Sequence, residues 1–99
     1  MPKTTVSHEG LGVEVVLDFS IRPTIAFEKA FVALKERIDA GERISAREYG
    51  LEVVLQAIES GVLDLPQKEL EADWQPAAIE WLSTEIALAY QAATTISPE

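Results

Sequence analysis

Val13-Glu14-Val15-Val16-Leu17-Asp18-Phe19 is the stretch that decides the fold class of this chain. Its odd-numbered residues are all apolar, so they share one side of an extended strand, while mostly polar residues share the other. Residues 4–7 can pair with this strand across the loop His8–Gly12, whose two glycines permit the positive φ values of a hairpin turn. The sequence therefore predicts an N-terminal β-hairpin over about residues 4–20.

A two-stranded hairpin is only marginally stable in water. We therefore expect it to pack on helices, or to gain further strands from another copy of the chain or from a partner. The edges of the hairpin are accordingly candidates for strand addition.

A first helix is predicted over about residues 23–40. Pro23 suits the first turn of a helix, and large apolar residues then recur on one helical face. These residues are Phe27, Phe31, Leu34 and Ile38. The outer face, with Glu28, Lys29, Lys35 and Glu36, is interpreted as solvated.

A second helix is predicted over about residues 46–60. Ser45 and Glu48 form an S-x-x-E capping box, in which each side chain can bind the other residue's free backbone N–H. Gly61 is expected to end this helix. Farther along, a short helix is predicted at 67–72.

The last helix is predicted over about residues 76–93, with Pro76 at its first position. The 99 residues suffice for one hydrophobic core, so we expect a single domain over 1–99. The predicted fold class is α+β, with an N-terminal β-hairpin packed on a small bundle of three helices, or four if the short helix is counted.

The net charge of −9 arises entirely in the second half of the chain. Residues 1–47 contain seven acids and seven bases, whereas residues 48–99 contain ten acids and one base, Lys68. This asymmetry favours either a polar partner or a solubilising surface. A protein this acidic lacks the basic face that binds nucleic-acid phosphates, so we expect no direct contact with DNA or RNA.

The remaining composition, with 47% hydrophobic and 25% charged residues, is that of a folded globular chain. The chain has no cysteine, so disulfides are excluded. No apolar run approaches the roughly 18 residues that a membrane span needs, and the N-terminus has no signal-like apolar segment. We therefore expect a soluble, cytoplasmic protein that does not bind membranes.

Two groups of acidic residues are candidate binding surfaces. Glu48, Glu52 and Glu59 share one face of the second helix. Glu69, Glu71 and Asp73 belong to the most acidic segment, around the short helix. Each group is either a solvated surface or a contact for a basic partner.

The last helix has two apolar stripes, so we expect it to pack against two different surfaces. The stripe containing Leu82 and Ile86 belongs to the core, whereas Ala77, Trp81, Leu88 and Ala92 lie about 140° away around the helix. The second stripe packs either on the chain itself, on the hairpin or around Trp74, or on another protein. Trp81, Leu88 and Trp74 are therefore the candidate protein-binding residues.

No catalytic chemistry is indicated. His8 is the only histidine and lies in the predicted loop, with no spaced set of metal ligands around it. The chain has no nucleophile-elbow, phosphate-loop or calcium-loop motif. We expect no catalytic residue, no cofactor and no metal site, and the chain is not expected to be an enzyme.

The sequence favours a small, acidic, non-catalytic protein-interaction or assembly protein that docks on another protein through its C-terminal helix or hairpin edge and that can form homo-oligomers. In size and acidity it resembles accessory proteins of bacteria and their phages, such as tail-assembly chaperones. An alternative is an acidic inhibitor that mimics nucleic acid in a basic groove, as anti-restriction and anti-CRISPR proteins do. A carboxylate-dependent enzyme is the remote third reading.

Overall fold

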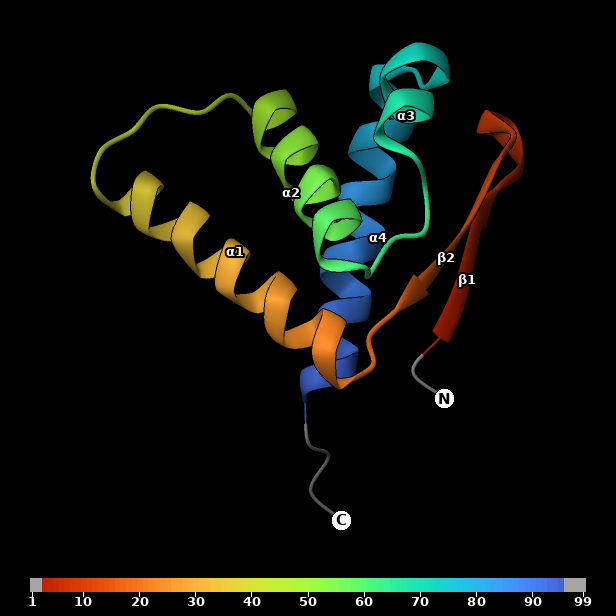
Figure 1. The fold of residues 1–99 in the computed structure, drawn as a ribbon. Helices are drawn as coiled ribbons and strands as arrows, with labels where there is room; N and C mark the ends of the chain where they lie inside the picture. The colour runs from red at the N-terminus through yellow and green to blue at the C-terminus, as the bar shows by residue number, and fades with distance from the viewer. Residues whose placement is uncertain (1–2, 96–99) are drawn as a thin grey trace.

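The computed structural model describes residues 3–95, except the side chains of Gln67 and Asp73. A two-stranded antiparallel hairpin comes first, followed by helices that pack together beside it (Figure 1). The elements are β1 (Lys3–His8), β2 (Val13–Asp18), α1 (Ile21–Asp39), α2 (Ala46–Ser60), α3 (Gln67–Asp73) and α4 (Pro76–Thr94). The α+β fold class, an N-terminal hairpin on a helical bundle, is confirmed.

The ends of α2 follow from local chemistry. Ser45 Oγ accepts a hydrogen bond from the Glu48 N–H at 3.2 Å, which is one half of the predicted capping box. At the other end, Gly61 adopts φ +89° and donates its N–H to the Ile58 carbonyl. A left-handed conformation of this kind is readily available only to glycine, so α2 ends where the sequence places the stop.

The other helices begin and end within about two residues of their expected bounds. The largest difference is at α1, which starts at Ile21, two residues before Pro23. Pro23 still lies in the first turn, where backbone N–H groups have no partner within the helix, so its missing N–H costs no hydrogen bond.

The loop of the hairpin contains a short 3-10 turn, Glu9–Leu11. His8 Nδ1 accepts the N–H of Leu11 at 3.2 Å and caps this turn. Gly12 then takes φ +67°, whereas Gly10 does not have a positive φ, so only one of the two loop glycines is used for its conformational freedom.

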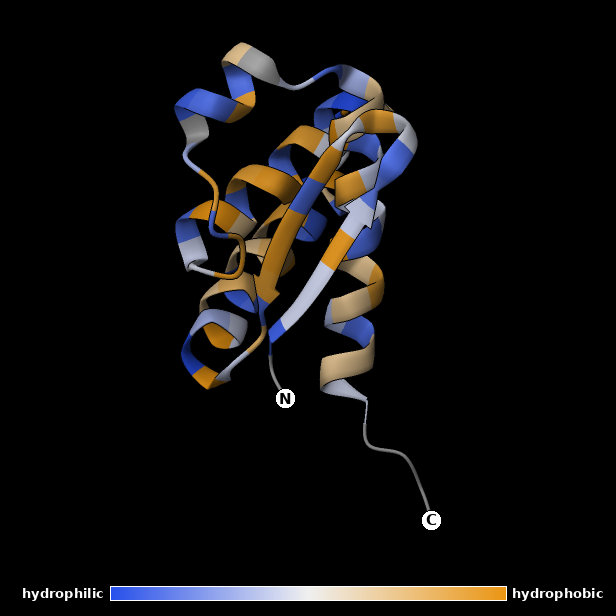
Figure 2. Ribbon diagram, turned by 90° about the vertical axis from the view of Figure 1, so that its right-hand side faces the viewer, coloured by the Kyte–Doolittle hydropathy of each residue, from blue (hydrophilic) through white to orange (hydrophobic). Residues whose placement is uncertain are grey.

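The hairpin is supported on the inner side of β2. Val15 and Leu17 are buried in the core, and the chain just after α2 runs beside the end of the strand. The N–H of Asp18 donates to the Val62 carbonyl at 2.7 Å, and Leu17 forms an isolated bridge with Leu63. One edge of the sheet is therefore partly covered by the chain itself, as Figure 2 shows on the β2 side.

The helices α2 and α4 pack closely against each other around Gly50. A Cβ atom added to Gly50 would lie 3.2 Å from Ser83 Oγ and 3.9 Å from Glu80 Cα, so the absence of a side chain lets the two helices approach. The buried cluster consists of Val15, Leu17, Phe19, Phe27, Leu34, Val53, Val54, Ala57, Val62, Leu63, Leu70, Leu82 and Ile86.

Aromatic side chains attach α1 to α4. The Tyr90 ring lies 5.4 Å from the ring of Phe27 and about 6 Å from those of Phe19 and Phe31. The Tyr90 hydroxyl donates to Glu28 Oε2 at 2.6 Å. This hydrogen bond, together with partial burial and the carboxylate charge, raises the pKa of Tyr90 to about 12.

Gly50→Leu is expected to lower the free energy of unfolding by about 1–3 kcal/mol, because the added side chain must separate α2 from α4 or distort both. Thermal or urea unfolding followed by circular dichroism measures the effect. Ala33→Leu, on an exposed position of α1, is the matched control and should change stability little. Equal stability of the Gly50→Leu and Ala33→Leu variants would contradict the close packing of α2 against α4 at Gly50.

Tyr90 is expected to stay protonated in the folded protein until the pH approaches 12. The ordinary value is 10, so the folded state holds its proton more tightly than the unfolded chain. This contribution to stability is fully present below pH 10 and is lost as the pH rises through 12. Absorbance of the phenolate, compared between the native chain and Tyr90→Phe, reports the ionisation. In Glu28→Ala, Tyr90 should ionise at lower pH.

Candidate protein-docking surface

The second apolar stripe of α4 is divided between the chain's own hairpin and solvent. Trp81 is half-buried, and its ring meets the ring of His8 edge to face, with centroids 5.5 Å apart. Leu88, on the same helical face two turns later, is 56% exposed. Trp81 therefore packs within the molecule, while Leu88 presents an apolar side chain to water.

The outer edge of β1 is free. Six continuous residue pairs join β1 to β2, and no backbone hydrogen bond connects Lys3–His8 to any other part of the described chain. Only Val6 of this strand is half-buried. The N–H and C=O groups that point away from β2 therefore face solvent over the length of the strand.

The free edge of β1 meets α4 at one end, where the His8 ring contacts the Trp81 ring. In Figure 2, α4 runs behind the hairpin on the side of the β1 edge. Leu88 lies about 10 Å farther along the same face of α4 as Trp81, and it also lines a groove between α1 and α4. We call the edge of β1 together with Leu88 the β1–α4 surface.

Trp74, the third apolar candidate, lies elsewhere. It follows α3 and is half-buried against the core. Together with Gly10, Leu11 and Ala78 it lines a small hollow of about 150 Å³ beside the hairpin loop. It is therefore not part of the β1–α4 surface.

The two acidic groups remain on separate helices. On α2, Glu48 and Glu59 are exposed and Glu52 is half-buried. On α3, Glu69 and Glu71 are exposed, and the side chain of Asp73 lies outside the described part of the structure. A binding role for either group stays a prediction.

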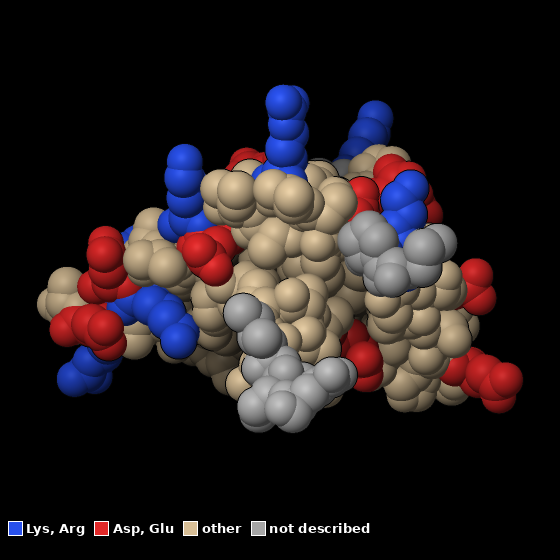
Figure 3. Space-filling view, turned by 90° about the horizontal axis from the view of Figure 1, so that it is seen from below, with Lys and Arg blue, Asp and Glu red and all other residues tan. Residues whose placement is uncertain are grey.

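Sequence reasoning missed a group of exposed apolar residues on α1. Ile21, Ile25 and Val32 are 79%, 50% and 47% exposed, on the face interpreted as solvated. Their spacing of i, i+4 and i+11 places them within about 40° of one another, which is the signal that could have identified them. Figure 3, the view from below, shows uncharged side chains across the middle of the molecule and basic side chains projecting along one edge.

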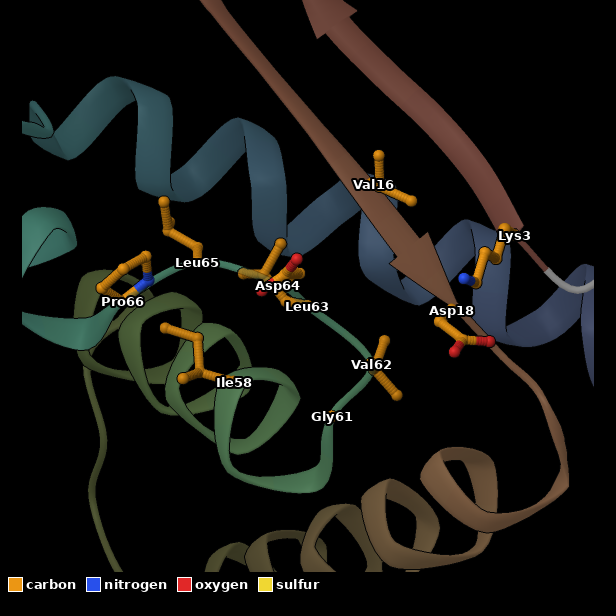
Figure 4. A pocket seen from close by; sticks show the side chains of 10 residues that line it. All are labelled: Lys3, Val16, Asp18, Ile58, Gly61, Val62, Leu63, Asp64, Leu65 and Pro66. Carbon is orange, nitrogen blue, oxygen red and sulfur yellow. The ribbon is translucent and has the colours of Figure 1, made fainter.

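An open cleft of about 780 Å³ lies on the opposite side of the hairpin, between β2 and residues 61–66 (Figure 4). Lys3 and Asp18 lie at one end of it and Asp64 on the other wall. Asp18 Oδ1 accepts the N–H of Ser20 at 3.0 Å, so this carboxylate already holds the turn into α1. The ten residues that line the cleft include no histidine, serine or threonine, so they do not pair a hydroxyl nucleophile with a histidine base.

Within the part of the chain that is described, no three or more His, Cys, Asp or Glu side chains lie close enough together to hold a metal ion. Over the same residues, no helix combines the length and apolar character needed to cross a bilayer. Comparisons with protein-family models, curated proteins and solved structures gave no match to this chain.

Trp81→Ala and Leu88→Ala are expected to differ in their effects on stability. Loss of the half-buried Trp81 ring removes a support of the hairpin loop and should cost about 1–3 kcal/mol, whereas Leu88→Ala should stay within about 0.5 kcal/mol of the native chain. Urea unfolding followed by tryptophan fluorescence or circular dichroism compares them. A large loss of stability in Leu88→Ala would place this residue in the core and remove it from the surface.

Proposed function

We propose that this chain is a non-catalytic protein-interaction protein, an accessory or assembly subunit that binds an extended segment of another protein at the β1–α4 surface. The observation that carries the proposal is the unpaired edge of β1, which meets α4 at Trp81 on the helical face that also carries the exposed Leu88. An edge of this kind supplies the backbone hydrogen bonds of strand addition, and a neighbouring apolar side chain supplies a contact that selects the partner's side chains.

The edge of β1 lacks the features that usually prevent strand addition. Its ladder with β2 runs through all six pairs without a bulge, and the strand contains neither proline nor an acidic residue. Lys3, at one end, is its only permanently charged side chain. An added strand can therefore pair with the free backbone groups of residues 4–8 without lying beside a permanently charged side chain of β1.

The surroundings indicate what the added segment looks like. Alternate side chains of an added strand point toward α4, where Leu88 favours apolar residues. Glu85 lies one turn before Leu88 on the same helix, whereas Glu80 faces α2 and pairs with Arg47, and the chain as a whole is acidic. The segment that fits is therefore extended, apolar at alternate positions, and uncharged or basic elsewhere.

The alternative functions receive less support. Mimicry of nucleic acid requires carboxylates arranged along a groove-filling surface, and the two acidic groups lie on two separate helices. An enzymatic function would need converging reactive groups, and the cleft of Figure 4 offers none. Both alternatives remain predictions from composition.

The test begins with a partner isolated by affinity capture, whose binding to the purified chain is then measured by calorimetry. Leu88→Ser should weaken binding by about tenfold or more, while Val16→Ser, which alters an exposed apolar residue on the outer face of the hairpin, should leave it unchanged. Hydrogen exchange of the β1 amides should slow on binding, because strand addition gives them hydrogen-bond partners.

Binding that leaves the β1 amides unprotected and tolerates Leu88→Ser would contradict the proposal. Light scattering of the chain alone identifies the case in which the bound segment is a second copy. A dimer that dissociates in Leu88→Ser, but not in Val16→Ser, would place self-association at the β1–α4 surface.

A further inference from the structure

The exposed apolar residues of α1 lie among basic side chains. Ile21, Ile25 and Val32 form a stripe about 16 Å long along one side of the helix. On a helical projection Arg22 and Lys29 border one side of this stripe, and Lys35 borders the other. Residues 21–35 contain these three bases and one acid, Glu28, so this segment is net positive within a chain of charge −9.

The basic side chains of this segment have no carboxylate partner. Two other arginines of the described chain are paired, Arg37 with Glu42 at 2.7 Å and Arg47 with Glu80 at 3.5 Å. No ion pair within residues 3–95 involves Arg22, Lys29 or Lys35. The one acid among them, Glu28, accepts the hydrogen bond of Tyr90. An anionic partner would therefore meet available cations.

A groove adjoins the stripe along the side of Lys35. It has a volume of about 270 Å³ between α1 and α4, with Phe27, Phe31, Tyr90 and Leu88 among its walls. The Lys35 ammonium lies 5.2 Å from the centre of the Phe31 ring, on the rim. Groove and stripe meet at consecutive residues, Phe31 and Val32, and together form one surface, which we call the α1 surface.

We propose that the α1 surface binds an acidic amphipathic helix of a partner protein. Apolar side chains spaced by three and four residues would cover the stripe and enter the groove, and flanking carboxylates would pair with Arg22, Lys29 and Lys35. The charge complementarity selects an acidic occupant over a basic or neutral one. This site differs from the β1–α4 surface, although Leu88 borders both, and it goes beyond the proposed function.

A protein helix fits this surface better than an anionic membrane does. Asp39 lies five turns after Ile21 on the same side of α1, and Glu36 also borders the stripe. A flat anionic surface would meet these carboxylates together with the cations, whereas a helix of about four turns can end before reaching Asp39. Three basic residues are also few for holding a strongly acidic chain on anionic lipid.

The test uses two synthetic amphipathic helices of equal length, with leucines at i, i+3, i+4 and i+7. One has glutamates on its flanks and the other has lysines at the same positions. Nuclear magnetic resonance of the isotope-labelled chain maps the contacts and gives the affinities. The acidic peptide should shift the amide signals of Ile25, Val32 and Lys35, and its affinity should fall as salt is raised.

Variants of exposed residues define the surface further. Lys29→Glu combined with Lys35→Glu should weaken the acidic peptide by about tenfold or more, while Lys68→Glu, a charge reversal on α3, should not. Ile25→Ser combined with Val32→Ser removes the apolar contact without altering charge and should also weaken it. Circular dichroism confirms that each variant is folded. The amide signals of Lys3–His8 should not shift with the acidic peptide, which separates this test from that of the proposed function.

Several outcomes would overturn the inference. These are equal binding of the lysine peptide, no binding of either peptide, and contacts that map away from α1. Binding to vesicles containing phosphatidylserine in preference to the acidic peptide would assign the surface to a membrane instead, and would likewise refute the proposal of a helical protein partner.

Discussion

The close packing of α2 against α4 is the contact on which the other elements depend. Gly50 has no side chain where α4 presents Ser83, so the two helices approach closely and their apolar faces form the middle of the core. The hairpin attaches to this pair through Leu17 and the chain that follows α2. The first helix packs against α2 and also meets α4 through aromatic contacts with Tyr90.

This arrangement leaves two different surfaces at the periphery. The β1 strand contributes backbone groups and few charges, whereas α1 contributes apolar side chains with cations around them. In Figure 1, α2 and α4 lie between the hairpin and much of α1, so the two surfaces face largely separate regions of space. The two surfaces meet at Leu88, which also lines the groove between α1 and α4. We propose a binding role for each surface for the same physical reason: the fold leaves its backbone or side-chain groups without partners.

Local sequence patterns predicted the elements because their causes are local. The Ser45 cap, the Gly61 stop and the alternation around Leu17 each act within a few residues, and the structure contains all three. Local patterns could not predict which residues the second apolar stripe of α4 contacts. His8 covers Trp81 and leaves Leu88 exposed, a difference that depends on where the hairpin ends in space. The stripe on α1 was readable from spacing, but the charged residues among it favoured an interpretation as a solvated face.

The order of the elements along the chain affects how the protein folds during synthesis. Strand β2 precedes, by a long stretch of sequence, the residues that cover its apolar side, including Leu63, Leu82 and Ile86. Until α4 has been synthesised, Val15 and Leu17 lack most of their native neighbours, and the hairpin alone is only marginally stable. Completion of the core therefore waits for α4. Until then the nascent chain exposes a strand-forming segment that can pair with other chains.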